Sequence, residues 1–462
     1  MTTAAAVRPP RRNARHTPLA ADGPMPAAML RDALAIRRDP LGYLAATVAR
    51  YGDLVAFPLP RTPVLLVNTP DGARRVLQDN HRSYGKRTVQ YAALGLVTGE
   101  GLLTADGEEW RRRRRAAQPA FHHGRLGAVA TAASRAGDHL RDTWDAAPDG
   151  VLDVDRATLA TMLEVVGSTF FAADLAADAE RLVDAVDTAL QVVVRRARSL
   201  LPAVLPGWLP TPSQRRLRRA VATLDGACES VVRGRAAGPA GDDADVLAAL
   251  LRVADPEWVR DEIVTLVIAG HETVASCLTW TLHLLAGHPD AQERIAAEVG
   301  ALGEDGPRGL ADLAELPWTK AVVDEALRLY PPAWLITRRA LADDEISGLA
   351  VPSGTLVVLS PWLLHRRGAE WPEPERFDPH RFLQAGCAGR GRAGPREGYL
   401  PFGAGPRLCI GRDVALVQAV LILGRLLRGR RVLRPAAAPG VRVDALVTLR
   451  PRGGLPLRLV PR

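Results

Sequence analysis

The chain has 462 residues and a formal net charge of +9. Apolar residues make up 47% and charged residues 24% of the sequence, a balance that excludes a disordered or fibrous chain, and this length suffices to bury a large core without cross-links. The cysteines, Cys228, Cys277, Cys387 and Cys409, are too widely spaced to form a CxxC pair, which argues against a disulfide framework and a structural zinc site.

Residues 1–35 are basic and contain several prolines, which predicts a flexible arm in front of the folded part of the chain. This arm has no continuous apolar stretch, and the whole sequence has no uninterrupted apolar run of about 18 residues. We therefore expect no signal peptide and no membrane span, and predict a cytoplasmic protein. The segment VAFPLPRTPVLLVNTP, which ends at residue 70, alternates apolar runs with prolines and predicts short strands joined by turns.

Residues 105–330 consist mainly of long Ala/Leu/Val/Arg segments with helical periodicity. Prolines interrupt this pattern at 200–214, which predicts an exposed apolar loop. After residue 330, strand-like pieces such as TLVVLS (355–360) alternate with coil, and a Gly/Arg-rich loop (385–398) precedes a helix that begins near Cys409. The pattern predicts one helix-rich fold with small sheets near both ends of the chain.

The excess of arginine is spread along the chain and includes the run Arg111 to Arg115. A run of this kind is typical of a solvated helix face, and it also suits a docking surface for an acidic protein partner. No recognised nucleic-acid-binding module accompanies it, so we expect no nucleic-acid partner.

The segment PFGAGPRLCIG (401–411) carries the clearest chemical signal. Its residues follow the spacing FGxGxRxCxG, with Phe402, Gly403, Gly405, Arg407, Cys409 and Gly411 at the fixed positions. The glycines let the backbone turn tightly and approach a flat macrocycle, and a thiolate at the start of the following helix is stabilised by backbone N–H groups. Phe402 can shield the sulfur, and Arg407 can neutralise a carboxylate. These features indicate an iron porphyrin held by Cys409, whereas the alternative is a Gly-rich turn with a buried structural cysteine.

This segment resembles the haem-binding loop of the cytochrome P450 superfamily. The resemblance covers residues 36–460 and implies a mainly α (α+β) single domain, residues 36–462, with haem b buried between two central helices. Cys409 is then the metal ligand, and Phe402, Gly403, Arg407 and Gly411 belong to the cofactor-binding set.

The family's oxygen-binding helix is matched by AGHETVAS (269–276). The resemblance implies that Gly270 permits close approach to bound dioxygen, and that the Thr273 hydroxyl bonds back to the Ala269 carbonyl and opens the helix locally. Glu272 then supplies the acid of an acid–alcohol pair that delivers protons. A zinc HExxH helix is excluded because position 275 is Ala.

Two further motifs are matched. In EALRLYPP (325–332), Glu325 and Arg328 form an ExxR pair, and the resemblance implies that Arg376 of PERF (374–377) completes a buried structural triad with them. In EEWRRRRRAAQPAF (108–121), Trp110 and Arg114 stand in the WxxxR spacing with which the family binds a haem propionate.

Arg338 resembles another propionate-binding position, although its neighbour Arg339 is a competitor. His365 we interpret as a structural histidine whose hydrogen bonds are satisfied. The segment GRGRAG (389–394) fits GxGxxG but neither follows a strand nor opens a helix, so it carries little weight as a dinucleotide site.

By resemblance, the chain is a monooxygenase that uses O2 and electrons from a separate ferredoxin or flavodoxin and its reductase, because about 50 residues after Cys409 leave no room for a flavin domain. Segments 84–104, 200–214, 266–273 and 330–339 are predicted to form apolar pocket walls, which suit an apolar small-molecule substrate. Several stretches resemble bacterial carotenoid ring hydroxylases, which favours a terpenoid or carotenoid.

Other functions are also compatible with the sequence. A polyketide or fatty-acid oxidase would use the same core motifs. A haem-thiolate isomerase or sensor would bind haem without oxygenation, and a basic scaffold or nucleic-acid-binding protein would bind no haem. The Glu272–Thr273 pair argues against a protein without oxygenase chemistry, because such a protein needs no proton delivery.

Overall fold

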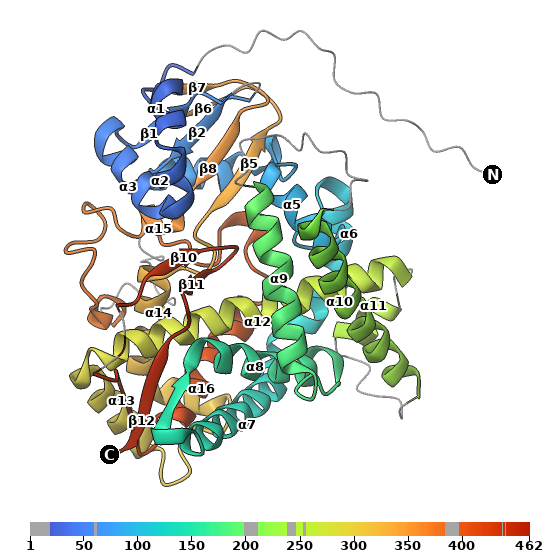
Figure 1. Cartoon of the computed structure of the whole chain (residues 1–462), viewed down its shortest axis with the longest axis vertical. Coiled ribbons are helices and arrows are strands. Elements are labelled where there is room, and N and C mark those ends of the chain that lie inside the picture. The colour runs from blue at the N-terminus through green and yellow to red at the C-terminus, as the bar shows by residue number, and fades with distance from the viewer. Residues whose placement is uncertain are drawn as a thin grey trace.

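The computed structural model describes residues 19–59, 62–197, 211–237, 246–252, 256–383, 397–436, 438 and 440–462. Residues 1–18 of the predicted arm lie outside the described residues, as do most of the predicted loops 200–214 and 385–398, including Cys387 and GRGRAG. Figure 1 shows a large helical part and a smaller part built around a sheet, which agrees with the predicted α+β class.

The sheet joins two distant stretches of the chain. Its strands lie in the order β1 (Leu54–Phe57), β2 (Val64–Val67), β8 (Leu356–Leu359), β5 (Ile336–Ala340) and β3 (Tyr84–Gly85). β2 and β8 run parallel and the other neighbours antiparallel. Their apolar side chains form a core of their own around Leu65, Val67 and Val357. The strands predicted near both ends of the chain therefore exist, and they pair with one another.

The N-terminal segment is more ordered than the sequence predicted. The helices α1 (Pro26–Arg31), α2 (Ala33–Arg38) and α3 (Pro40–Tyr51) follow one another along the edge of the sheet, so the predicted boundary at residue 35 falls inside α2. Met29 packs against the β1–β2 core, and the Asp39 carboxylate accepts a 2.9 Å hydrogen bond from the Gly42 N–H at the start of α3. The basic composition of the segment concealed these local contacts.

The helical part is built around α12 (Pro256–Ala286), which crosses the middle of the molecule (Figure 1). It packs against α8 (Val154–Val166), α14 (Pro317–Leu329) and α16 (Arg412–Leu426), and α7 (Leu126–Asp145) packs against α16. By length and composition α12 could cross a membrane, but 83% of its apolar window is buried within the protein. A helix that is apolar on all sides and covered by other helices is a core helix.

The remaining helices surround the helical core or pack against the sheet. They are α4 (Pro70–Arg74), α5 (Val89–Thr98), α6 (Gly107–Ala117), α9 (Ala179–Ala197), α10 (Pro212–Ala237), α11 (Val246–Leu251), α13 (Pro289–Ala301) and α15 (Pro361–Leu364). Of these, α4 and α15 pack against the sheet. The small sheets are β4 (Val151–Asp153), β12 (Pro456–Pro461) and β9 (Arg430–Leu433); β6 (Asp344–Ile346) and β7 (Leu349–Val351); and β10 (Val443–Ala445) and β11 (Leu449–Pro451).

The β10–β11 hairpin lies directly on α12. The Ser276 hydroxyl and the Trp280 indole N–H both donate to the Leu449 carbonyl, at 2.7 Å and 3.0 Å. Because these two residues are one helical turn apart, they form a stripe that fixes the hairpin along the helix axis. This contact brings the C-terminal residues of the chain beside the AGHET segment.

Candidate active site

Cys409 lies in a tight loop that leads into α16. Its N–H donates a 3.0 Å hydrogen bond to the Phe402 carbonyl. Gly403 and Gly405 have φ angles of 72° and 69°, the left-handed region that favours glycine. A Cβ at Gly405 would lie 1.9 Å from the Leu77 carbonyl oxygen. Gly405 is therefore required by backbone packing inside the protein, and the approach of this loop to a macrocycle stays a prediction.

The surroundings of Cys409 suit a thiolate ligand. Burial among protein atoms raises the pKa of the thiol, whereas the Gly411 N–H and the positive charges of Arg114 and Arg412 favour its ionised form. The side chain is nonetheless accessible at its surface. A metal ion bound to this accessible sulfur would displace the remaining proton of the thiol.

The arginines of the run Arg111 to Arg115, beside this loop, differ in their contacts. Arg111 pairs with Glu108, and Arg112 with Glu109. Arg113 is buried between Glu109 and Glu262, at 2.8 and 3.1 Å. Arg114 is the member of the run whose Nη1 donates to the carbonyl of Leu408, at 3.0 Å. The structure therefore places Arg114 against the Cys409 loop, at the position that the WxxxR spacing selected.

Trp110 lies on the same side of α6 and contacts Arg407. The Arg407 guanidinium carbon is 4.3 Å from the centroid of the Trp110 ring. Arg407 also donates to the Ala105 carbonyl at 2.9 Å and forms an ion pair with Asp106. Burial lowers the pKa of Arg407 to about 10 although Asp106 opposes this. Trp110, Arg114 and Arg407 are thus brought together around the Cys409 loop.

Arg338 and Arg339 are neighbours on β5 and point in opposite directions, as successive residues of a strand do. Arg338 is 7% exposed, and its Nη1 donates to the Tyr91 hydroxyl at 3.3 Å. Arg339 instead donates to the carbonyls of Arg87 and Gly354, each at 3.0 Å. Arg338 therefore faces the interior of the protein, and the competitor Arg339 faces away from it.

Lys86 is a buried cation that the sequence did not mark. Its Nζ donates to the Leu103 carbonyl at 2.9 Å and lies 4.5 Å from the centroid of the Tyr91 ring. Burial holds the pKa of Lys86 well below its ordinary value, and Arg338 and Arg407 lower it further. No motif includes this lysine, so only its place in the fold associates it with the site.

Asp106 is the carboxylate near Lys86 and Arg407, and Arg338 lies close enough to Lys86 to lower its pKa. Buried cations in excess of their carboxylate partners are costly unless a ligand supplies negative charge. A ligand with two carboxylates would balance this group, and the two propionates of haem b have that chemistry. The cations and the accessible Cys409 sulfur therefore fit the cofactor that the sequence predicted.

The AGHET segment of α12 shows the predicted local hydrogen bond. The Thr273 hydroxyl donates to the Ala269 carbonyl at 2.7 Å. Ala269 and Thr273, one turn apart, are partly exposed within an otherwise buried stretch of α12, so this face borders on an accessible space. Gly270 lies against α8, because a Cβ there would lie 2.8 Å from the side chain of Val166, and its approach to dioxygen stays a prediction. It permits close packing of α12 on α8.

Glu272 is buried and held by Thr448 and by Arg450 of β11. Its carboxylate accepts hydrogen bonds from the Thr448 hydroxyl at 2.9 Å and from Arg450 Nη1 at 3.2 Å. Arg450 is also bound to Asp155 of α8. The AGHET motif contains Glu272, but no spacing in the sequence connects it to Arg450 or Asp155, so these two residues were not predicted. In the described residues, the Thr273 hydroxyl bonds to Ala269 and the Glu272 carboxylate to the β10–β11 hairpin, so the two groups do not bond to each other.

The ExxR pair is buried as predicted, but its third member was misassigned. Arg376 is exposed and pairs with Glu373 at 2.9 Å. The guanidinium beside Glu325 is that of Arg381, at 3.5 Å and 7% exposed. The sequence contained the signal, since PHRF (379–382) repeats the Pro-x-Arg-Phe spacing of PERF. Burial, which the spacing does not reveal, distinguishes the two arginines.

His365 is the satisfied structural histidine that was predicted. Its Nε2 accepts a hydrogen bond from the Leu400 N–H at 2.8 Å, so its Nδ1 carries the proton and donates to the Arg328 carbonyl at 3.1 Å. This ring therefore links the C-terminal end of α14 to the start of the Cys409 loop.

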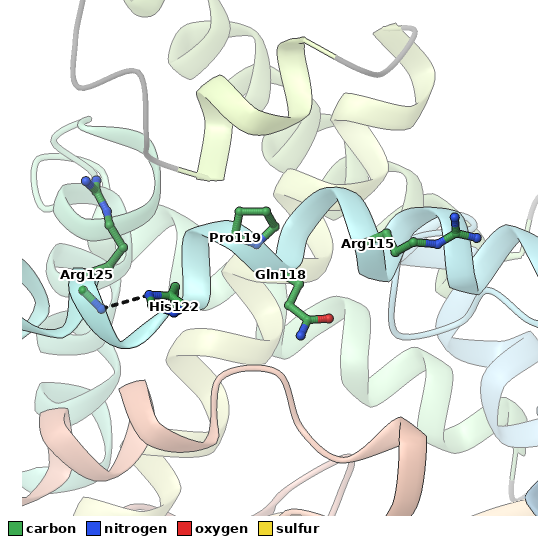
Figure 2. Close-up of a pocket in the computed structure, with 6 residues that line it drawn as sticks. Arg115, Gln118, Pro119, His122 and Arg125 are labelled. Atoms are coloured by element: carbon green, nitrogen blue, oxygen red, sulfur yellow. Dashed lines mark hydrogen bonds between the residues drawn. The ribbon is translucent and has the colours of Figure 1, made fainter.

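An open hollow of about 660 Å³ lies on the outer side of this region (Figure 2). It is lined by Arg115, Gln118, Pro119, His122, Gly124 and Arg125. The lining is near the Cys409 loop, because Phe121 lies 3.7 Å from the position of a Cβ on Gly411. The charged residues of this lining are basic. Part of the arginine excess of the chain therefore lies next to the Cys409 loop.

Comparisons with known proteins agree with this geometry. The sequence profile described as Cytochrome P450 matches residues 23–447. The chain is 36% identical to cyclooctatin synthase of Streptomyces melanosporofaciens, over 99% of this chain and 97% of the relative. It is 33% identical to pentalenene oxygenase of Streptomyces avermitilis, over 97% and 99% of the two chains.

The fold also matches solved structures. CYP175A1 from Thermus thermophilus superposes with a TM-score of 0.76 at 32% identity, over 95% of this chain and 99% of that one. The match of the profile to most of the chain, together with these relatives, establishes the family. The chain belongs to the cytochrome P450 superfamily and is a haem-b-binding monooxygenase.

Proposed function

We propose that this monooxygenase hydroxylates an apolar terpenoid, a class that includes the carotenoids, with Cys409 as the ligand of the haem iron. The observation that carries this proposal is the accessible Cys409 sulfur next to a group of buried cations. The relatives support the substrate class, because the names cyclooctatin synthase and pentalenene oxygenase refer to terpenoids. A hydrocarbon of this class has few polar groups, which suits the apolar segments predicted to form the pocket.

The bound haem supplies the oxygen-activating chemistry, by which one atom of O2 enters a C–H bond of the substrate. Cys409 would hold the iron, while Lys86, Arg338 and Arg407 would hold the propionates. Arg114 fixes the Cys409 loop through the Leu408 carbonyl. These residues orient the cofactor and stabilise its negative charges.

Thr273 and Glu272 would handle protons on the opposite side of the site. The Thr273 hydroxyl donates to the Ala269 carbonyl. This bond weakens the helical backbone hydrogen bond that the same carbonyl accepts. Glu272 is the buried acid next to Thr273 in the chain. Its hydrogen bonds with Thr448 and Arg450 fix the position of its carboxylate. An isomerase or a sensor would have no use for this acid and alcohol.

Electrons would come from a small acidic iron–sulfur or flavin protein, a ferredoxin or flavodoxin, with its reductase. The support for this partner is the basic hollow around Arg115 and Arg125, next to the loop that carries Cys409. Opposite charges at this surface would speed encounter and orient the partner. The proposed setting is the cytoplasm.

The experiment that tests the proposal is the absorption spectrum of the reduced, carbon-monoxide-bound protein. We expect a red-shifted Soret band that is lost in Cys409→Ala, since the shift comes from thiolate ligation. A histidine-type band would contradict the assignment of Cys409. A titration of the ferric protein with pentalenene, monitored by the change in spin state, then tests the substrate class, with a fatty acid of similar size as the competitor. Tighter binding of the fatty acid would contradict the terpenoid proposal.

A further inference from the structure

Arg450 is shared between buried carboxylates from two different helices. Its Nε and Nη2 donate to the two carboxylate oxygens of Asp155 at 2.8 and 2.6 Å. Its Nη1 donates to Glu272 at 3.2 Å. Arg450, Asp155 and Glu272 are 8%, 6% and 4% exposed. A single side chain from β11 therefore joins α8 to α12 at the acid proposed to handle protons.

The two carboxylates are held unequally. Asp155 receives two parallel hydrogen bonds from the planar guanidinium, the geometry that makes Arg–carboxylate pairs strong. Glu272 receives one longer bond from Arg450, and its other oxygen accepts from the uncharged Thr448 hydroxyl at 2.9 Å. Asp155 consequently takes the larger share of the positive charge.

The groups around this cluster add negative charge. Asp153 lies at the start of α8 and Asp187 faces Arg450 and Glu272 from α9. His271, whose Nε2 is 3.9 Å from Glu272, does not compensate, because burial lowers its pKa and leaves the ring neutral.

The cluster is therefore short of positive charge. Burial acts to lower the pKa of Arg450, but Glu272 and Asp155 more than reverse this effect. Burial also raises the pKa of Asp155, and the hydrogen bonds from Arg450 oppose this only in part. In the described part of the chain, one guanidinium thus serves two buried carboxylates. Such a cluster favours taking up a proton.

We propose that Asp155 sets the proton affinity of Glu272 by competing with it for Arg450. This inference rests on the proposed function, in which Glu272 gives up protons at the oxygen-binding face. Asp155 and Arg450 are positioning residues that act through Glu272. When Glu272 releases its proton, the carboxylate left behind is stabilised by Arg450 and Thr448, and uptake of a proton from solvent restores the acid.

The competition makes opposite predictions for the two positioning residues. In Asp155→Asn, Arg450 no longer pairs with a second carboxylate and interacts more strongly with Glu272. The ionised form of Glu272 is then favoured, so Glu272 binds its proton more weakly. In Arg450→Gln, two carboxylates face each other without a cation, so Glu272 binds its proton more tightly. We expect the midpoint of Glu272 protonation to fall by about one pH unit in the first variant and to rise by about one unit or more in the second.

The readout is the infrared carbonyl band of a protonated carboxyl group, titrated with pH in the holoenzyme. The band is assigned to Glu272 by its loss in Glu272→Gln, made in each background. Asp138→Asn is the matched control, because Asp138 forms a similar forked pair with Arg425, between α7 and α16. We expect this control to leave the Glu272 band unshifted.

A merely structural role would destabilise both variants and move the Glu272 midpoint in one direction or not at all, and either result would overturn the inference. If Arg450→Gln does not fold, Arg450→Lys keeps the charge and loses the fork, and we expect a smaller upward shift. The carbon-monoxide spectrum distinguishes failure of this inference from failure of the proposed function. A red-shifted band, together with Glu272 midpoints that move in the same direction in both variants, refutes the competition alone. A histidine-type band refutes the proposed function.

Discussion

The Glu325 carboxylate and the Arg328 guanidinium form a forked ion pair at 2.7 and 2.8 Å, with both side chains fully buried. The remaining donors of Arg328 bind three backbone carbonyls, those of His365, Pro374 and Arg376. Glu325 in turn accepts a 2.9 Å hydrogen bond from the Asp378 N–H. The pair therefore fixes α14 to the coil that precedes the Cys409 loop.

Substitution of Glu325 by Gln should destabilise the protein strongly. The variant leaves a buried guanidinium without its carboxylate, and breaking a buried pair in this way costs about 3–5 kcal/mol. Denaturant unfolding of the holoenzyme measures the loss. Glu373→Gln is the control, because its pair with Arg376 is exposed and is expected to contribute less than about 1 kcal/mol. Equal losses in the two variants would contradict the anchoring role of Glu325.

The motifs located several local features of the candidate site, because each motif depends on short spacings within one loop or helix. Cys409, Thr273 with Ala269, and the Glu325–Arg328 pair all lie within such segments. The residues that were missed act across the fold. Lys86 directly follows the short strand β3 and Arg450 lies in a C-terminal hairpin, and tertiary packing alone brings them to the site. Arg376 was predicted in the place that Arg381 occupies, because the two Pro-x-Arg-Phe spacings are identical and burial alone distinguishes their arginines.

Arg338 and Arg339 offer a matched pair for testing the cofactor contacts. Arg338→Leu should release haem roughly tenfold faster, since it removes a charge-assisted hydrogen bond from a buried carboxylate. Arg339→Leu should leave the rate unchanged, because Arg339 binds the carbonyls of Arg87 and Gly354 on the other face of β5. Transfer of haem to an excess of apomyoglobin measures both rates. Faster release from the Arg339 variant would reverse the assignment.

Thr273→Val should reduce product formation by roughly tenfold to a hundredfold and divert O2 to hydrogen peroxide, because the variant lacks the hydroxyl proposed to take part in proton delivery. Thr273→Ser should retain most of the activity. Product and peroxide are measured against O2 consumed. Thr281→Val is the control, since Thr281 makes the same 2.7 Å bond within α12, to the Cys277 carbonyl, away from the site. A Thr273→Val enzyme with unchanged coupling would exclude the proposed role.

The basic hollow should control the encounter with the electron donor. Reversing the charges of Arg115 and Arg125 should raise the apparent KM for ferredoxin several-fold at low salt, and the effect should shrink as salt screens the charges. Arg31→Glu is the control, because the Arg31 side chain is 75% exposed on α1. Steady-state reduction rates at two ionic strengths provide the measurement. A KM that is unchanged at low salt would place the docking surface elsewhere.

The two hydrogen bonds of His365 require a neutral ring, because a second ring proton would point at the Leu400 N–H that Nε2 now accepts. Burial lowers the pKa of His365 to about 3, and the nearby charges of Arg366 and Arg328 act in the same direction. In the unfolded chain the pKa returns to about 6.5. The unfolded state therefore binds the proton first as the pH falls.

The stabilisation by the neutral ring is consequently complete above about pH 6.5 and decreases towards pH 3, by up to about 1.4 kcal/mol per pH unit. Urea unfolding over this range measures the free energy of unfolding of the protein and of His365→Gln. The difference between these two free energies should become smaller as the pH falls. His123→Gln is the control, since the His123 side chain is 77% exposed and should give no such trend. A difference that stays constant between about pH 7 and pH 5 would mean that His365 takes up a proton as readily in the folded protein as in the unfolded chain, and the Leu400 N–H would then need another acceptor.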